Sequence, residues 1–169
     1  MKTRSLVLVA LALVIAPLSA EQEPAVDMDQ LIIDFGRLGG DDNFDMLLIH
    51  LNDLTTDALF EPPQKYILRA QARGQTMFLL RGTALRDATL NVDFQLGETG
   101  ALGISNHRTR MISINQLENG TEFSAGEEFL GILALETSIS LASRMILTSG
   151  LIRFEFQFTP NVLQQLQQD

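Results

Sequence analysis

Apolar and polar residues alternate along several short segments, and this alternation constrains the fold more than any other feature. The clearest case is 152–158, where Ile152, Phe154, Phe156 and Phe158 alternate with polar residues. Successive side chains of a β-strand point to opposite faces of a sheet, so the pattern predicts a strand with one buried face. The pattern recurs in 66–73, 90–96 and 133–141, and more weakly in 31–36, 76–81 and 110–115.

Glycine-containing breaks separate these segments. They lie at Gly74, Gly82, 97–103, Asn119-Gly120, Gly126 and Ser149-Gly150. Because glycine adopts turn conformations without steric cost, such breaks are typical of strand-to-strand connections. Seven or eight short strands joined by turns predict an all-β, mainly antiparallel fold. We expect a β-sandwich, with a closed barrel as the alternative.

Two segments allow a second interpretation. In 43–54 the apolar residues keep helical spacing, but they also fit a strand that returns from 31–36 around Gly39-Gly40. We favour the strand, since short apolar runs are ambiguous by periodicity alone. Near the C-terminus, Thr159-Pro160 resembles a helix cap followed by proline at the first helical position. Residues 160–169 therefore form either a short helix or a frayed tail, and both interpretations stay open.

The first twenty residues have the pattern of a secretory signal peptide. Lys2 and Arg4 precede an uninterrupted apolar run over 6–16, and the small residue Ala20 precedes an acidic residue. The run is shorter than the roughly 20 residues that span a bilayer. We expect cleavage after Ala20, export to the periplasm or the extracellular space, and no transmembrane segment in the mature chain.

Composition limits what the mature chain can be. The full chain carries a net charge of −9, and without Lys2 and Arg4 ten basic side chains stand against 21 acidic ones, a net charge of −11. An acidic chain is a poor nucleic-acid binder, because phosphate contacts need clustered lysine and arginine. The absence of cysteine excludes disulfides, thiol nucleophiles and cysteine-bound metals. We expect a single β-rich domain over 21–159 that is held together by packing.

Acidic residues are densest before residue 62, and three oxygen-bearing residues there have the spacing of a metal loop. Asp41, Asn43 and Asp45 match the first three ligand positions of a calcium loop. Met46 stands where that loop needs glycine, and Asn52 stands where it needs a bidentate glutamate. Calcium at Asp41, Asn43 and Asp45 is one hypothesis, and an acidic turn without a metal is the other. No other cofactor is expected.

Arginines are concentrated in the middle of the chain. Candidate binding residues are Arg69, Arg73, Arg108 and Arg110, which would receive an anionic ligand or an acidic protein partner. In the alternative interpretation, which we favour, the arginines pair with the chain's own excess of carboxylates.

Motifs for catalysis are missing from the sequence. No G-x-S-x-G nucleophile elbow occurs, and His50 and His107 lie far apart, the first in an apolar run and the second in a polar turn. We therefore expect a non-catalytic module for binding, adhesion or assembly, with strand addition at a sheet edge as a natural mode of association. A small β-barrel carrier of an apolar ligand is the alternative. A hydrolase or isomerase that uses carboxylates and His107 is the third hypothesis.

Overall fold

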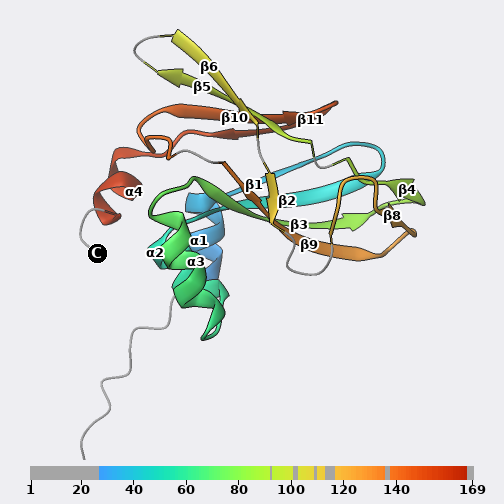
Figure 1. Cartoon of the computed structure of the whole chain (residues 1–169), viewed down its shortest axis with the longest axis horizontal. Helices are drawn as coiled ribbons and strands as arrows, with labels where there is room; N and C mark the ends of the chain where they lie inside the picture. The colour runs from blue at the N-terminus through green and yellow to red at the C-terminus, as the bar shows by residue number, and fades with distance from the viewer. Residues whose placement is uncertain are drawn as a thin grey trace, which may run out of the picture.

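The structure is a computed structural model that describes residues 27–91, 93–100, 103–108, 110–112, 117–135 and 138–166. In these residues two antiparallel sheets stack on each other (Figure 1). The larger sheet has the order β1 (Gly36–Gly40), β2 (Phe44–Leu51), β3 (Met77–Ala84), β9 (Glu128–Ala134) and β7 (Arg110–Ile112). The smaller sheet has the order β11 (Ile152–Phe156), β10 (Arg144–Ser149), β5 (Gln95–Gly100) and β6 (Gly103–Arg108). A short pair is formed by β4 (Ala88–Thr89) and β8 (Glu122–Phe123).

The predicted mainly antiparallel β-sandwich is confirmed. Every strand pair in the described residues is antiparallel, and neither sheet closes into a barrel there. The predicted strand in 43–54 is correct, because β2 covers most of that segment.

Phenylalanines of both sheets, and one from the segment before β5, contribute to the buried core. Phe78 of β3 packs on Phe156 of β11 with ring centroids 5.0 Å apart, and Phe94 packs on Phe154 at 6.0 Å. All four side chains are buried. Each such side chain contributes roughly 1.5–3 kcal/mol by leaving water. The alternating pattern of 152–158 therefore supplies the wall of the core, as the sequence predicted.

Helices lie at one end of the larger sheet (Figure 1): α1 (Met28–Phe35), α2 (Asp53–Leu59) and α3 (Gln64–Ala72). Helix α2 begins with a reciprocal cap, in which the Asn52 side chain accepts from the Thr55 amide and the Thr55 hydroxyl accepts from the Asn52 amide. The predicted C-terminal helix is confirmed as α4 (Pro160–Gln165), where the Thr159 hydroxyl accepts from the amide of Val162.

Four predicted strands need correction. The segment 66–73 lies mainly in helix α3, and 31–36 lies mainly in helix α1. In α3 only Leu68 is buried, so the alternation of apolar residues there did not reflect a buried sheet face. The third, 133–141, is a strand only at its start, because β9 ends at Ala134. The fourth, 90–96, is a strand only at its end, because β5 begins at Gln95.

Candidate functional site

The candidate calcium residues lie at the turn between β1 and β2. The Oδ1 atom of Asp41 accepts from the amides of Asn43 and Phe44, at 2.7 and 3.0 Å. The Oδ1 atom of Asn43 accepts from Nε of Arg86 at 2.7 Å. Asp45 is exposed on β2 and pairs with Gly40 across the hairpin. The turn is thus closed by hydrogen bonds of the protein itself.

A cation at this turn would compete with those hydrogen bonds for the oxygens of Asp41 and Asn43. Among the described residues, no three histidine, cysteine, aspartate or glutamate side chains are grouped to hold a metal. The calcium hypothesis stays a prediction. A thermal melt with and without a chelator tests it, because a ligand of the native state raises the midpoint.

Arg69 is engaged by carboxylates of its own chain. It projects from α3 toward α2, where its Nε atom lies 3.2 Å from Oδ1 of Asp53 and its Nη1 atom lies 3.1 Å from Oδ1 of Asp57. Further ion pairs join Arg81 to Glu128, Arg86 to Asp42, and both Arg144 and Arg153 to Glu155. These arginines therefore pair with carboxylates of their own chain, as the interpretation that we favoured from the sequence expects.

The other candidate arginines lie on different elements. Arg73 is exposed and ends helix α3. Arg108 is the last residue of β6, paired with Gln95, and Arg110 is the first residue of β7, paired with Ala134. Arg108 thus belongs to the smaller sheet and Arg110 to the larger. Helix α3 and β6 lie well apart (Figure 1), and the side chains of Arg108 and Arg110 lie outside the described part of the structure. A shared anion site of the four arginines stays a prediction.

Strand β6 forms an edge of the smaller sheet. It pairs with β5 on one side, and no described strand pairs with it on the other. The β5–β6 hairpin projects beyond the rest of the smaller sheet (Figure 1). No acidic residue occurs between Glu98 and Glu118, whereas Arg108 and Arg110 fall inside that interval. The open edge therefore belongs to a locally basic segment of an acidic protein.

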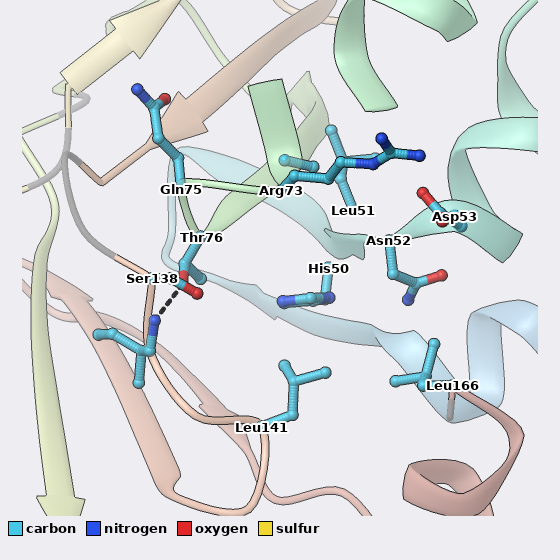
Figure 2. Close-up of a pocket in the computed structure, with 12 residues that line it drawn as sticks. His50, Leu51, Asn52, Asp53, Arg73, Gln75, Thr76, Ser138, Leu141 and Leu166 are labelled. Carbon is cyan, nitrogen blue, oxygen red and sulfur yellow. Dashed lines mark hydrogen bonds between the residues drawn. The ribbon is translucent and has the colours of Figure 1, made fainter. Parts of the chain in front are cut away.

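A second candidate site is a pocket of about 230 Å³ beside the end of β2. Its lining comes from the end of β2, the start of α2, the end of α3, the segment before β3, the segment before β10 and the end of α4. The lining includes His50, Asn52, Arg73, Gln75, Leu141 and Leu166 (Figure 2).

His50 is one of two buried polar residues that line this pocket; 5% of its surface is exposed, against 3% for Thr76. Its ring lies edge-on to the rings of Phe78 and Phe158, each at a centroid distance of 5.4 Å. The Nδ1 atom is buried and has no hydrogen-bond partner in the described structure. Burial lowers the pKa of His50 from 6.5 to about 4, because the charged imidazolium would lose its hydration. The imidazole is therefore neutral at pH 7.

Asn52 places a second unpartnered polar atom in the pocket. Its Oδ1 atom accepts from the amide of Thr55 at 3.0 Å, while its buried Nδ2 atom has no partner among the described residues. In Figure 2 the amide nitrogen is turned toward His50 and the amide oxygen is turned away from it. The buried Oε1 atom of Gln75 also lacks a partner, but that side chain points away from His50 (Figure 2).

Sequence reasoning identified His50 as a residue of an apolar run but did not find this pocket. Asn52 and Gln75 carry no motif, and the pocket joins segments more than 100 residues apart along the chain. One local signal concerns the orientation of Asn52. Asn52 precedes Asp53-Leu54-Thr55, a pattern typical of a helix cap, and a capping asparagine directs its side-chain oxygen to the backbone of the helix.

Comparison with known protein families, with curated proteins and with solved structures finds no match for this chain. In the part of the chain that the structure describes, no helix combines the length and the apolar character needed to cross a membrane.

Proposed function

We propose that this chain is an exported, non-catalytic binding module that takes up an extended, acidic segment of a partner protein at strand β6. The observation that carries the proposal is the open outer edge of β6 in a projecting hairpin. An edge strand presents a row of backbone N–H and C=O groups, and an added strand satisfies them.

Charge argues for an acidic partner segment. Arg108 ends β6 and Arg110 follows closely, with no acidic residue from 99 to 117. Complementary charge speeds association and disfavours wrong partners. The remainder of the chain is strongly acidic, so an acidic segment would be repelled from most of the surface and favoured here.

The two other functions receive less support from the geometry. A carrier of apolar ligands needs a lined cavity, typically of at least about 300 Å³, but phenylalanines occupy the space between the sheets. A larger hollow of about 500 Å³ lies at the surface against β4 and β8, and its lining includes the exposed residues Asp87, Thr89 and Glu122. A hydrolase would need a histidine oriented by a carboxylate. The buried Nδ1 atom of His50 has no such partner, and the side chain of His107, on which that hypothesis was made, lies outside the described part of the structure.

Export is part of the proposal and rests on the pattern of residues 1–20. A module without cysteine suits that setting, because neither oxidation nor disulfide exchange changes its fold.

The direct test is binding of a fluorescein-labelled octapeptide of alternating valine and glutamate, followed by fluorescence anisotropy on the mature protein. We expect saturable binding that weakens with salt, and no binding of the matched valine–lysine peptide. Arg108→Gln is expected to weaken binding about tenfold, or about 1.4 kcal/mol. Arg81→Gln removes an exposed arginine from the other sheet and is expected to have no effect. Equal binding of both peptides, or equal losses in both variants, would contradict the proposal.

A further inference from the structure

Asn119 is the only asparagine of the chain that is followed by glycine. Asparagine is a thermolabile residue, and it loses its side-chain amide without an enzyme when the backbone nitrogen of the next residue attacks the side-chain carbonyl carbon. Glycine has no Cβ atom and lets the two groups approach closely, whereas a β-branched residue hinders the approach. The sequence therefore singles out Asn119 for this reaction.

Asn119 and Gly120 form the centre of an exposed turn between Glu118 and Thr121. The Thr121 amide donates to the carbonyl oxygen of Glu118 at 3.3 Å, and the φ angle of Gly120 is 87°. Residues with a side chain rarely adopt a positive φ, so the turn itself requires glycine at this position. The fold therefore keeps the reactive pair at the surface, where water reaches it.

The reaction at Asn119 consists of two steps. The backbone nitrogen of Gly120 gives up its proton and bonds to Cγ of Asn119, the bond from Cγ to Nδ2 breaks, and ammonia leaves with that proton. The product is a five-membered succinimide ring. One water molecule then adds to either ring carbonyl and opens the ring, which yields aspartate or isoaspartate. Water is the one co-reactant that this scheme needs.

Hydrogen bonds to Leu90 hold the attacking nitrogen in the folded protein. The Gly120 amide donates to the carbonyl oxygen of Leu90, and the Leu90 amide donates to the carbonyl oxygen of Thr121, each at 2.9 Å. The Leu90 side chain is fully buried, so this anchor belongs to the core. The attack therefore requires a local opening in which the turn leaves Leu90. The adjoining β4–β8 pair has only two residues in each strand, and such short pairs are marginally stable.

We propose that Asn119 is a site of spontaneous deamidation, which the hydrogen bonds to Leu90 slow but do not prevent. Both products add a negative charge near the exposed residues Glu118 and Glu122. Isoaspartate also lengthens the backbone by one methylene, which displaces the turn relative to Leu90. The modified protein should therefore melt at a lower temperature than the unmodified one. The inference does not use β6, and it stands whether or not β6 binds a peptide.

The test incubates the folded mature protein and the guanidinium-unfolded chain in parallel, at neutral and at mildly alkaline pH. Peptide mapping by mass spectrometry follows the replacement of an amide by a carboxyl group at each asparagine, and electron-transfer fragmentation separates aspartate from isoaspartate. We expect both products at Asn119. They should form more slowly in the folded protein than in guanidinium, and faster at the higher pH, because base frees the attacking nitrogen.

The chain supplies its own controls. Asn91 and Asn161 are also exposed but precede valine, so they should keep their amides over the same period. The protein is made in a host without N-glycosylation, because Asn119-Gly120-Thr121 also matches the acceptor sequence for a glycan, which would occupy the reacting amide.

Matched variants identify the reacting groups. Asn119→Gln keeps a side-chain amide but would have to close a six-membered ring, so the product at this position should disappear. Gly120→Ala is compared in the unfolded chain, where no turn fixes φ, and should slow the reaction there. Freshly prepared Asn119→Asp carries the new charge without the longer backbone. Its melting midpoint should lie between that of the unmodified protein and that of the isoaspartate fraction isolated by ion exchange.

The proposal fails if Asn119 stays intact in the folded protein after the unfolded chain has reacted completely, because the turn would then exclude the reaction. It also fails if Asn91 or Asn161 loses its amide as fast as Asn119, or if Gly120→Ala reacts at the original rate in guanidinium, because the following glycine would then be irrelevant. An isoaspartate fraction that melts together with the unmodified protein would contradict the predicted displacement of the turn from Leu90.

Discussion

The Nε atom of Arg37 on β1 donates a hydrogen bond of 3.0 Å to the carbonyl oxygen of Glu155 on β11. A side chain of the larger sheet thereby satisfies a backbone acceptor on an edge strand of the smaller one. The guanidinium also lies 5.3 Å from the centroid of the Phe156 ring. The β11 edge is thus partly covered from within the molecule, whereas β6, the other edge of that sheet, has no further strand beside it among the described residues.

Replacing Arg37 by methionine should lower the free energy of unfolding by about 1–2 kcal/mol. The substitution keeps an unbranched side chain but removes the charge-assisted hydrogen bond to Glu155 and the contact with Phe156. Arg81→Met removes an exposed arginine of the larger sheet and should cost less than about 0.5 kcal/mol. Urea unfolding measures both, and equal losses would show that Arg37 does not join the sheets.

Stability should depend on pH through His50. Its pKa falls from 6.5 to about 4 on folding, so below pH 6.5 the unfolded chain takes up a proton that the native protein does not. Between pH 7 and pH 5 this histidine should therefore lower the free energy of unfolding by about 2 kcal/mol.

The variant His50→Phe should lose this part of the pH dependence. The same substitution removes the unpartnered Nδ1 atom and preserves an aromatic ring beside Phe78 and Phe158, so stability at pH 7 should not fall by more than about 1 kcal/mol. Parallel denaturation curves of both proteins at pH 7 and pH 5 provide the measurement. An identical pH dependence in the two would contradict the buried, neutral state of His50.

Gly82 should not tolerate a side chain. A Cβ atom there would lie 2.3 Å from Cζ of Phe129 and 2.8 Å from the carbonyl oxygen of Asp45. Gly82→Ala should destabilise the protein by about 1–3 kcal/mol through overpacking. Gly74→Ala meets no atom within 4 Å and is the matched control, with an expected change within about 0.5 kcal/mol. Thermal melts decide between these outcomes, and similar midpoints for the two variants would refute the close packing at β3.

Export should leave a mature protein that begins at Glu21. The apolar run and the small residue at position 20 predict this cleavage. Intact-mass measurement of the protein recovered from a secreting host checks it. Recovery of the uncleaved chain inside the cell would contradict the assignment of the first twenty residues.

Strand-forming patterns were most predictive where the residues face the core. In 152–158 each apolar residue is buried between the sheets, so the alternation directly reports the packing. In 66–73 the same period was misleading, because Tyr66 and Ile67 are 60% and 55% exposed and their order carries no packing information. Glutamine, lysine, leucine, arginine and alanine dominate helix α3, and their helix propensity was the better guide.

The candidate sites were less predictable than the fold. The spacing of Asp41, Asn43 and Asp45 suggested converging oxygens, yet the turn directs an oxygen of Asp41 to its own backbone and one of Asn43 to Arg86. The His50 pocket depends on contacts between β2 and segments around residues 75, 140 and 166. No local pattern encodes such long-range contacts, so the buried state of His50 emerges only from the assembled fold.

Residue-resolved hydrogen exchange on β6 tests the central claim most directly. Exchange of the backbone amides of residues 103–108 is measured in the mature protein with and without the valine–glutamate octapeptide. Strand addition pairs alternate residues of an edge, so we predict new protection at alternate amides of β6 and no change along β1 or β11. Unchanged exchange along β6, or protection confined to another edge, would contradict the account.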